Sequence, residues 1–152
     1  MEEKEYFEDY KAGEKFISPG RTITESDIHA FSAFTGDWHP LHTNVEYAKE
    51  TMFKERIAHG MLVLVVGSAL QFRLGQYVAL PKNFIAFYGM DRVRFTGPVS
   101  IGDTINCETE VMAMDAKDDQ RGVVTSQSTI KNQRGEPCCV FVTKFLCARR
   151  PK

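Results

Sequence analysis

The sequence lacks a surplus of basic residues: 19 lysines and arginines are balanced by 20 acidic residues, which leaves a net charge of -1 over 152 residues. Proteins that bind nucleic acid neutralise phosphates with excess positive charge, so nucleic acid is not expected as a partner. Long hydrophobic runs are also lacking. The most apolar stretch, residues 61–70, is about half the roughly 20 residues that cross a bilayer, so no membrane partner is expected either.

Paired cysteine motifs are lacking as well, and no signal sequence is expected. The four cysteines, Cys107, Cys138, Cys139 and Cys147, include no C-x-x-C pair. Cys138 and Cys139 are adjacent and would face opposite sides of a strand, so no disulfide framework is predicted. Residues 1–5 are acidic and contain no apolar stretch of the kind found in signal peptides. We therefore expect reduced thiols and a cytoplasmic location.

What the sequence does contain is enough apolar material for a core. Hydrophobic residues make up 43% of the chain and charged residues 26%, which excludes a disordered or fibrous protein. The length matches one ordinary domain, and no internal repeat, low-complexity tract or linker divides it. We therefore predict a single domain over residues 1–152.

The first half of the chain carries helix signals. Thr24 is a predicted N-cap, and Asp27 three residues later completes a capping box. Apolar residues then recur near helical spacing until Gly36, a glycine of the kind that ends helices. Asn44 would cap a second, short helix that runs through Ala48.

A third helix is predicted over residues 60–70, a segment that is apolar on nearly every face. A helix of this kind must be covered on all sides. Because valine is frequent here, periodicity alone does not exclude a buried strand. The apolar character continues, however, through Phe72 and Leu74 to Gly75, a suitable C-cap. This length predicts a central buried helix.

The second half is typical of strands. Residues 83–95 are rich in aromatic and branched side chains, and residues 105–111 alternate with a period of two. Polar, glycine-containing turns precede apolar runs over 123–131 and 138–147, as in antiparallel hairpins. Helices followed by strands indicate the α+β class, with one antiparallel sheet wrapped around the apolar helix.

Acid and imidazole groups concentrate in one polar segment. Asp37 and His42 lie five residues apart, and Pro40 restricts the backbone between them, so both groups can converge on one small reactant. Asp37 would take a proton from water while His42 orients that water or handles a second proton. A surface loop whose side chains only cap neighbouring backbone is an equal alternative. Asp37, His39 and His42 are also acceptable metal ligands, but no second acid or histidine cluster completes such a site, so no metal is expected.

The start of the apolar helix offers a second candidate site. Gly60 would place unpaired N–H donors there, the helix dipole adds positive potential, and the missing side chain lets a carbonyl oxygen approach. Such a position stabilises an oxyanion or enolate, although a glycine selected only for tight packing fits the same pattern. Ser68, about two turns further on, could bond Asp37 or its own helix backbone. His59, at the helix entrance, is interpreted as a structural hydrogen-bonding residue.

Three stretches of the chain resemble one known family. The run T-G-D-W-H-P-L-H over residues 35–42 is similar to the signature G-D-x-N-P-L-H. The run I-A-H-G-M-L over 57–62, with Ser68 downstream, is similar to that family's helix entrance. The runs R-V-R-F-T-G-P-V over 92–99 and G-D-T-I over 102–105 are similar to its following strand and turn. The chain thus resembles the MaoC-like hydratases, also called the (R)-specific enoyl-CoA hydratase or hydratase 2 family.

The resemblance implies a hotdog fold, in which a sheet wraps around a long helix. It implies that Asp37 and His42 are the catalytic acid/base pair, and that the N–H of Gly60 holds the thioester carbonyl. Ser68 would support the active site. His39 stands where the family signature has asparagine, and an imidazole does not reproduce both groups of an amide. We expect this change to affect substrate binding and preference.

The activity implied by the resemblance is reversible hydration of trans-2-enoyl-CoA to (R)-3-hydroxyacyl-CoA. CoA is part of the substrate, so no separate cofactor is expected. Members of the family typically form homodimers with acyl-CoA at the subunit boundary, which implies a homodimer or a higher homo-oligomer. Two alternatives to hydratase activity remain: a hotdog acyl-CoA thioesterase, which would release free thiol, and a non-catalytic acyl-CoA-binding subunit.

Overall fold

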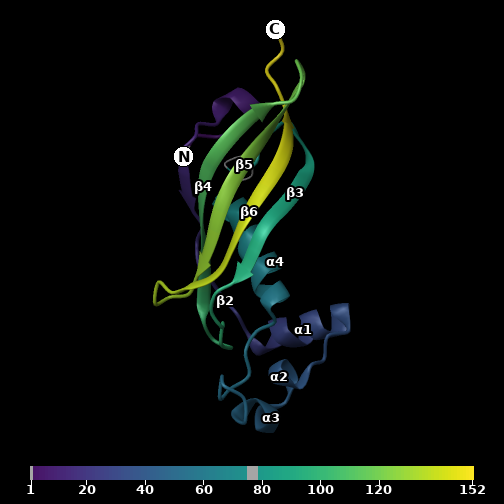
Figure 1. Ribbon diagram of the computed structural model, residues 1–152, viewed down its shortest axis with the longest axis vertical. Coiled ribbons are helices and arrows are strands. Elements are labelled where there is room, and N and C mark those ends of the chain that lie inside the picture. The colour runs from purple at the N-terminus through teal and green to yellow at the C-terminus, as the bar shows by residue number, and fades with distance from the viewer. Residues whose placement is uncertain (1, 75–78) are drawn as a thin grey trace.

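The computed structural model describes residues 2–74 and 79–152 (Figure 1). Its strands are β1 (Lys15–Ile17), β2 (Arg21–Thr22), β3 (Phe84–Phe95), β4 (Thr104–Ala116), β5 (Arg121–Lys131) and β6 (Pro137–Ala148). Its helices are α1 (Glu25–Thr35), α2 (Pro40–Thr43), α3 (Val45–Lys49) and α4 (Gly60–Leu70), with the 3-10 turns η1 (Phe7–Asp9) and η2 (Gln71–Leu74). Among the residues described, no helix combines the length and the apolar character that crossing a membrane requires.

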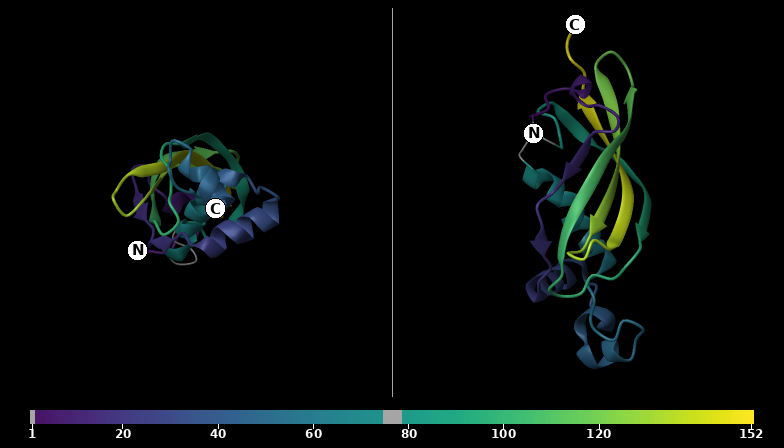
Figure 2. Two further views of the ribbon diagram at one scale, coloured as in Figure 1. Left: turned by 90° about the horizontal axis from the view of Figure 1, so that it is seen from below. Right: turned by 90° about the vertical axis from the view of Figure 1, so that its left-hand side faces the viewer.

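The strands form one antiparallel sheet in the order β1-β4-β5-β6-β3, with β2 paired to β4. Strands β4, β5 and β6 follow one another through short turns, which confirms the predicted hairpins. Figures 1 and 2 show the sheet curving around α4, while α1, α2 and α3 gather beyond one end of the sheet. A sheet wrapped around one central helix confirms the predicted α+β architecture.

The inward face of the sheet packs on α4. Every second residue is buried from Ile105 to Val111 in β4 and from Cys139 to Cys147 in β6, as a period of two requires. The main core cluster joins sheet and helix, and includes Leu62, Val63, Leu64, Leu70, Ile105, Cys107, Ile130, Cys139 and Phe141. The cysteines at all four positions are buried free thiols.

The central helix forms where it was predicted, but one of its faces is exposed. Helix α4 spans Gly60 to Leu70 and continues as η2 to Leu74; the predicted C-cap, Gly75, lies outside the described residues. The expectation that every face is covered is wrong, because Met61 and Val65 are 56% and 52% exposed. A single sheet layer covers only one side of a helix, so the opposite apolar side stays open.

Replacing Gly67 by valine is expected to destabilise the fold by about 2–3 kcal/mol, near the upper end of what overpacking costs. A Cβ on Gly67 would lie 2.2 Å from the Ile130 side chain, which is fully buried and has little room to move. Urea unfolding measures the change. Ala69→Val on the exposed side of the same helix is the matched control, and equal losses in both variants would contradict the packing argument.

Candidate active site

Helix α1 ends directly before the acid of the predicted pair. Thr24 accepts a hydrogen bond from the Asp27 N–H, and the Asp27 carboxylate accepts one from the Thr24 N–H, which confirms the predicted capping box. At the other end, Gly36 adopts a φ of 79° and donates to the Ser32 carbonyl 2.8 Å away, which confirms the predicted C-cap. This left-handed residue turns the chain and places Asp37 at the helix end.

Local hydrogen bonds build the turn that follows. The Asp37 carboxylate accepts from the His39 N–H at 3.2 Å, and His39 Nδ1 accepts from the Leu41 N–H at 3.1 Å. His39 is therefore the N-cap of α2, and Pro40 occupies the first turn, where a missing N–H leaves no hydrogen bond unmade. Helix α2 carries His42 in its last turn and fixes its position relative to Asp37.

The imidazole of His42 is held in one tautomer. Its Nδ1 lies 2.7 Å from the Ile57 carbonyl oxygen, and because a carbonyl only accepts, Nδ1 carries the hydrogen. Nε2 therefore keeps its lone pair. Burial lowers the pKa of His42, the hydrogen bond to Ile57 opposes this, and the adjacent His59 lowers the pKa further. The net shift is downward, which favours a neutral imidazole with one open acceptor.

His59 lies directly against this pair. Its ring is 2% exposed and stacks on the His42 ring, with the centroids 3.9 Å apart and the planes 30° from parallel. Its Nε2 lies 3.0 Å from the backbone carbonyl oxygen of Asp37 and 3.2 Å from Ser32 Oγ. The interpretation of His59 as a hydrogen-bonding residue agrees with these contacts, but its place beside the acid and the imidazole was not foreseen.

The predicted acid and imidazole do meet. One side-chain oxygen or nitrogen from each of Asp37, His42 and His59 lies within 4.8 Å of the other two. His39, the third ligand of the metal interpretation, is outside this group. His42 Nδ1 is bonded to the Ile57 carbonyl and His59 Nε2 to the Asp37 carbonyl, so each ring has one nitrogen left. The expectation that no metal binds stays a prediction.

Gly60 opens α4 next to the same side chains. Within the described residues, no acceptor lies on its N–H, which is one of the unpaired donors of a helix N-terminus. A Cβ at this position would lie 3.1 Å from the Phe95 ring. Gly60 and His42 both line a pocket of about 500 Å³. The other lining residues are mainly apolar: Leu41, Met52, Phe53, Ile57, Ala58, Val63, Phe95, Thr96, Gly97, Pro98, Val99 and Cys138.

Two expected site residues do not reach this pocket. His39 is exposed, does not line this pocket, and its Nδ1 is occupied as the cap of α2; its expected effect on substrate preference stays a prediction. Ser68 donates to the Val65 carbonyl at 3.0 Å and lines a separate pocket of about 200 Å³ with Phe72 and Phe145. The bond to Val65 is the bond to its own helix backbone that the sequence offered as an alternative, and the predicted support of the active site by Ser68 stays a prediction.

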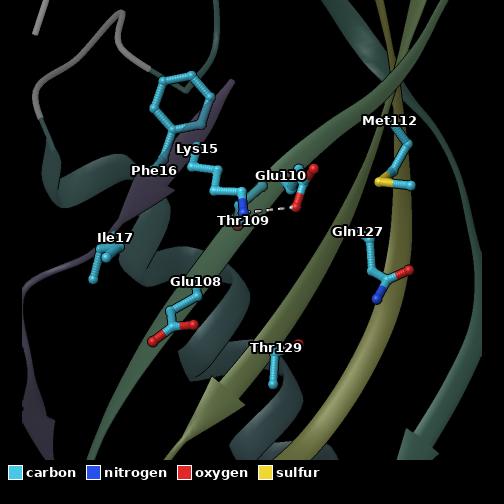
Figure 3. A pocket seen from close by; sticks show the side chains of 9 residues that line it. All are labelled: Lys15, Phe16, Ile17, Glu108, Thr109, Glu110, Met112, Gln127 and Thr129. Carbon is cyan, nitrogen blue, oxygen red and sulfur yellow. Dashed lines mark ion pairs between the residues drawn. The ribbon is translucent and has the colours of Figure 1, made fainter. Parts of the chain in front are cut away.

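A further hollow lies between β1, β4 and β5, and Figure 3 shows the side chains around it. Its polar lining is already engaged in part, because Lys15 and Glu110 form an ion pair at 3.4 Å. None of the residues assembled around Gly60 lines this hollow. By contrast, the Asp37 and His42 side chains lie close together, and His42 and Gly60 line the same pocket at the start of α4.

Comparisons with known proteins show the family to which the chain belongs. A family model described as MaoC like domain matches residues 9–133. The (R)-specific enoyl-CoA hydratase of Rhodospirillum rubrum is 41% identical over 109 residues, which cover 72% of this chain and 71% of that protein. A solved structure from Archaeoglobus fulgidus, described as a monoamine oxidase regulatory protein, matches with a TM-score of 0.90 and 41% identity, covering 97% of both chains. The unliganded R-hydratase PhaJ1 of Pseudomonas aeruginosa matches with a TM-score of 0.78 and 29% identity, covering 97% of this chain and 88% of that one.

The fold and the named relatives together define a hydro-lyase with the hotdog architecture. Named relatives include a hydratase and a 3-hydroxybutyryl-CoA dehydratase, and a more distant structure of the same fold is described as a double hotdog. The chain belongs to the MaoC-like domain family.

Proposed function

We propose that the protein catalyses the reversible hydration of trans-2-enoyl-CoA to (R)-3-hydroxyacyl-CoA. One observation carries the proposal: a carboxylate, a neutral imidazole and an unpaired backbone N–H meet beside one apolar pocket. Addition of water to an enoyl thioester needs a base for the water, an acceptor that orients it, and a donor for the developing enolate. The names of the relatives support the same reaction.

Asp37 is the acid/base of the proposed reaction. Its carboxylate takes a proton from water, and the water oxygen forms a bond to C3 of the enoyl group. The electron pair of the C2–C3 double bond moves toward the thioester oxygen. The enolate then collapses, C2 takes the proton back from Asp37, and the carboxylate is regenerated. One water is added, and no oxidant, reductant or separate cofactor takes part.

His42 orients the water in this scheme. Because Nδ1–H donates to the Ile57 carbonyl, only the Nε2 lone pair is available, and a lone pair accepts a hydrogen bond from water. A neutral Nε2 carries no proton to give, so delivery to C2 is assigned to Asp37 and not to His42. This narrows the broader role expected from the sequence, in which His42 also helped to deliver a proton.

The Gly60 N–H donates a hydrogen bond to the thioester oxygen, on which negative charge develops. It lies at the positive end of α4 and has no acceptor among the described residues, so it meets the oxygen without breaking a bond in the fold. The lining beyond it is mainly apolar, and its only titratable groups are His42 and the Cys138 thiol. Such a surface suits a hydrocarbon acyl chain better than an acyl group that ends in a carboxylate.

The rate is expected to fall as the pH drops through the pKa of His42, which lies below its ordinary value of 6.5. Protonation places a hydrogen on Nε2, which then no longer accepts from water. The pH profile of kcat/KM measures this acid limb. In His42→Gln, whose amide oxygen accepts without titrating, the limb due to His42 should disappear. A profile with the same limb in both proteins would contradict the acceptor role.

The assay that tests the function follows loss of the enoyl-CoA chromophore in the presence of the protein, across acyl chains of graded length. Chiral analysis of the 3-hydroxyacyl product tests the (R) configuration. A thiol dye in the same assay tests the thioesterase alternative, because a hydratase leaves the thioester intact. Binding of acyl-CoA without loss of chromophore or release of thiol would favour the non-catalytic alternative and overturn the proposal.

We also propose that the protein acts as a homodimer. Strand β3 is the edge of the sheet, and Ile85, Phe87 and Tyr88 on it are each about half exposed or more. The open side of α4 adds exposed Met61 and Val65. An unpaired edge strand with apolar side chains is a template for pairing with a second copy. Sedimentation velocity should give the mass of a dimer, and a monomer at working concentration would contradict this.

A further inference from the structure

We propose that His59 is a positioning residue whose one ring holds the acid and the imidazole of the site at a fixed spacing. The proposal rests on the function proposed above, since it concerns the same two groups. Its basis is the set of contacts made by one buried side chain: a hydrogen bond to the Asp37 backbone, a polar contact with Ser32, and a stack on His42.

The hydrogen bonding identifies the tautomer of His59. Nε2 lies 3.0 Å from the Asp37 carbonyl oxygen, and two acceptors do not bond each other, so Nε2 carries the hydrogen. Nδ1 is buried and has no hydrogen-bond partner in the part of the chain that the structure describes. The Ser32 hydroxyl, fully buried in α1, lies 3.2 Å from the same Nε2. Both polar contacts of the ring are thus made by Nε2, the nitrogen that faces the Asp37 carbonyl.

Contacts of the acid itself show why this bond matters. The other hydrogen bonds of Asp37 are local: its N–H donates to Thr35 Oγ1 and its carboxylate accepts from the His39 N–H, each at 3.2 Å. Both partners lie within two residues of Asp37, so neither ties it to the rest of the fold. The His59 Nε2–H is its link to the segment that enters α4, since His59 is the N-cap of that helix.

The flat face of the same ring supports the second catalytic group. The rings of His42 and His59 are stacked at 3.9 Å, and Phe31 packs near the His59 ring with the centroids 4.9 Å apart. Gly60 follows His59 directly in the chain. One side chain therefore sets the spacing between the carboxylate, the imidazole and the free N–H, and a displacement of about 1 Å in such a site can cost 10²-fold in rate.

The position of His59 argues against a direct chemical role. His59 is only 2% exposed, whereas Asp37 is exposed and His42 lines the pocket, so water and substrate can reach those two groups but not the His59 ring. A group that touches no substrate acts through those that do. His59 therefore holds Asp37 and His42 in place and exchanges no proton during turnover.

Two substitutions separate the functions of the ring. His59→Phe keeps an aromatic ring for the stack and removes the donor, whereas His59→Gln removes the ring and keeps an N–H near the position of Nε2. We expect kcat to fall by about 10–100-fold in His59→Phe, in keeping with a misplaced catalytic group, with KM little changed. In His59→Gln we expect kcat to fall by no more than about fivefold: the lost stack on His42 accounts for this fall, and the hydrogen bond that positions Asp37 is retained.

Further variants keep the test decisive. If His59→Phe fails to fold, His59→Asn replaces it, because the shorter amide does not reach the Asp37 carbonyl; Asn should be slow where Gln is fast. Ser32→Ala is the matched control, since it alters the other Nε2 contact and leaves the bond to Asp37. Wild-type kcat in a folded His59→Phe protein would overturn the proposal. Equal losses of kcat in His59→Gln and in His59→Phe, or in His59→Asn where it replaces the Phe variant, would also overturn it.

Two readouts separate this role from structural and acid/base roles, and from the proposed function. The pH profile of kcat/KM should keep the acid limb of His42 in His59→Phe, and the appearance or loss of a limb would show that His59 itself exchanges a proton, contrary to the proposal. Hydrogen–deuterium exchange without substrate should quicken over residues 37–42 in His59→Phe but not in His59→Gln. Unchanged exchange would overturn the positioning role, whereas a wild-type protein inactive on every enoyl-CoA would overturn only the function.

Discussion

Replacing Asp37 by asparagine is expected to lower kcat for enoyl-CoA hydration by about 10²–10⁴-fold, the range that a general acid or base supplies. The amide keeps the shape of the side chain and an oxygen that accepts from the His39 N–H, so the turn is retained. What is lost is the ability to take a proton from water. KM should change little, because Asp37 is not among the residues that line the apolar pocket. Steady-state kinetics gives both constants.

His42→Ala is expected to reduce kcat to a similar degree, because it removes the acceptor that orients the attacking water. The double variant should be little slower than the slower single variant, since both groups act on one water. His39→Asn is the matched control: an asparagine caps α2 as the imidazole does, so turnover close to wild type is expected. Wild-type turnover in Asp37→Asn or His42→Ala would refute the assigned roles.

Features that depend on nearby residues were predictable from the sequence. The capping box of Thr24 and Asp27 and the left-handed Gly36 are made by hydrogen bonds that span a few residues. Their residue types therefore carry the whole signal. The turn that brings Asp37 toward His42 is local in the same sense, because each of its two side-chain hydrogen bonds joins residues only two positions apart. The position of the acid/imidazole pair follows from this local chemistry.

Features that depend on the assembled fold were not predictable in the same way. Phe95, which packs over Gly60 and lines the pocket, comes from the far end of β3. The stack of His59 on His42 requires α2 to lie against the entrance of α4, and no spacing along the chain shows that packing. The one sequence signal for His59 was its place directly before Gly60. That place indicated a residue at the helix entrance without indicating its partners.

Ser68 shows the limit of helical spacing as an argument. Residues eight apart share roughly one face of a helix, which suggested that Ser68 and Gly60 serve one site. The same spacing separates them by about 12 Å along the axis, so a short side chain two turns away faces different neighbours. Helix α4 thus presents two separate pockets on the side where these residues lie, one at Gly60 and one at Ser68.

The backbone donor at Gly60 can be tested with two substitutions that differ by one N–H. Gly60→Ala adds a Cβ and keeps the donor, whereas Gly60→Pro adds a ring and removes it. Proline is well tolerated at the first position of a helix. The preceding residue, His59, has φ -56° and ψ 134°, an extended conformation that a following proline favours. Both variants are therefore expected to fold with similar melting temperatures.

Their activities should differ strongly. We expect kcat in Gly60→Pro to lie about 10²–10³-fold below that in Gly60→Ala, the usual cost of removing one oxyanion donor. Both variants press on the Phe95 ring, which is half exposed and can shift, so the effect of the added Cβ is matched by the alanine protein. Binding of a saturated acyl-CoA, which develops no enolate, should be similar in the two. Equal kcat values in folded Gly60→Pro and Gly60→Ala would show that the helix N-terminus does not hold the charge that forms during the reaction.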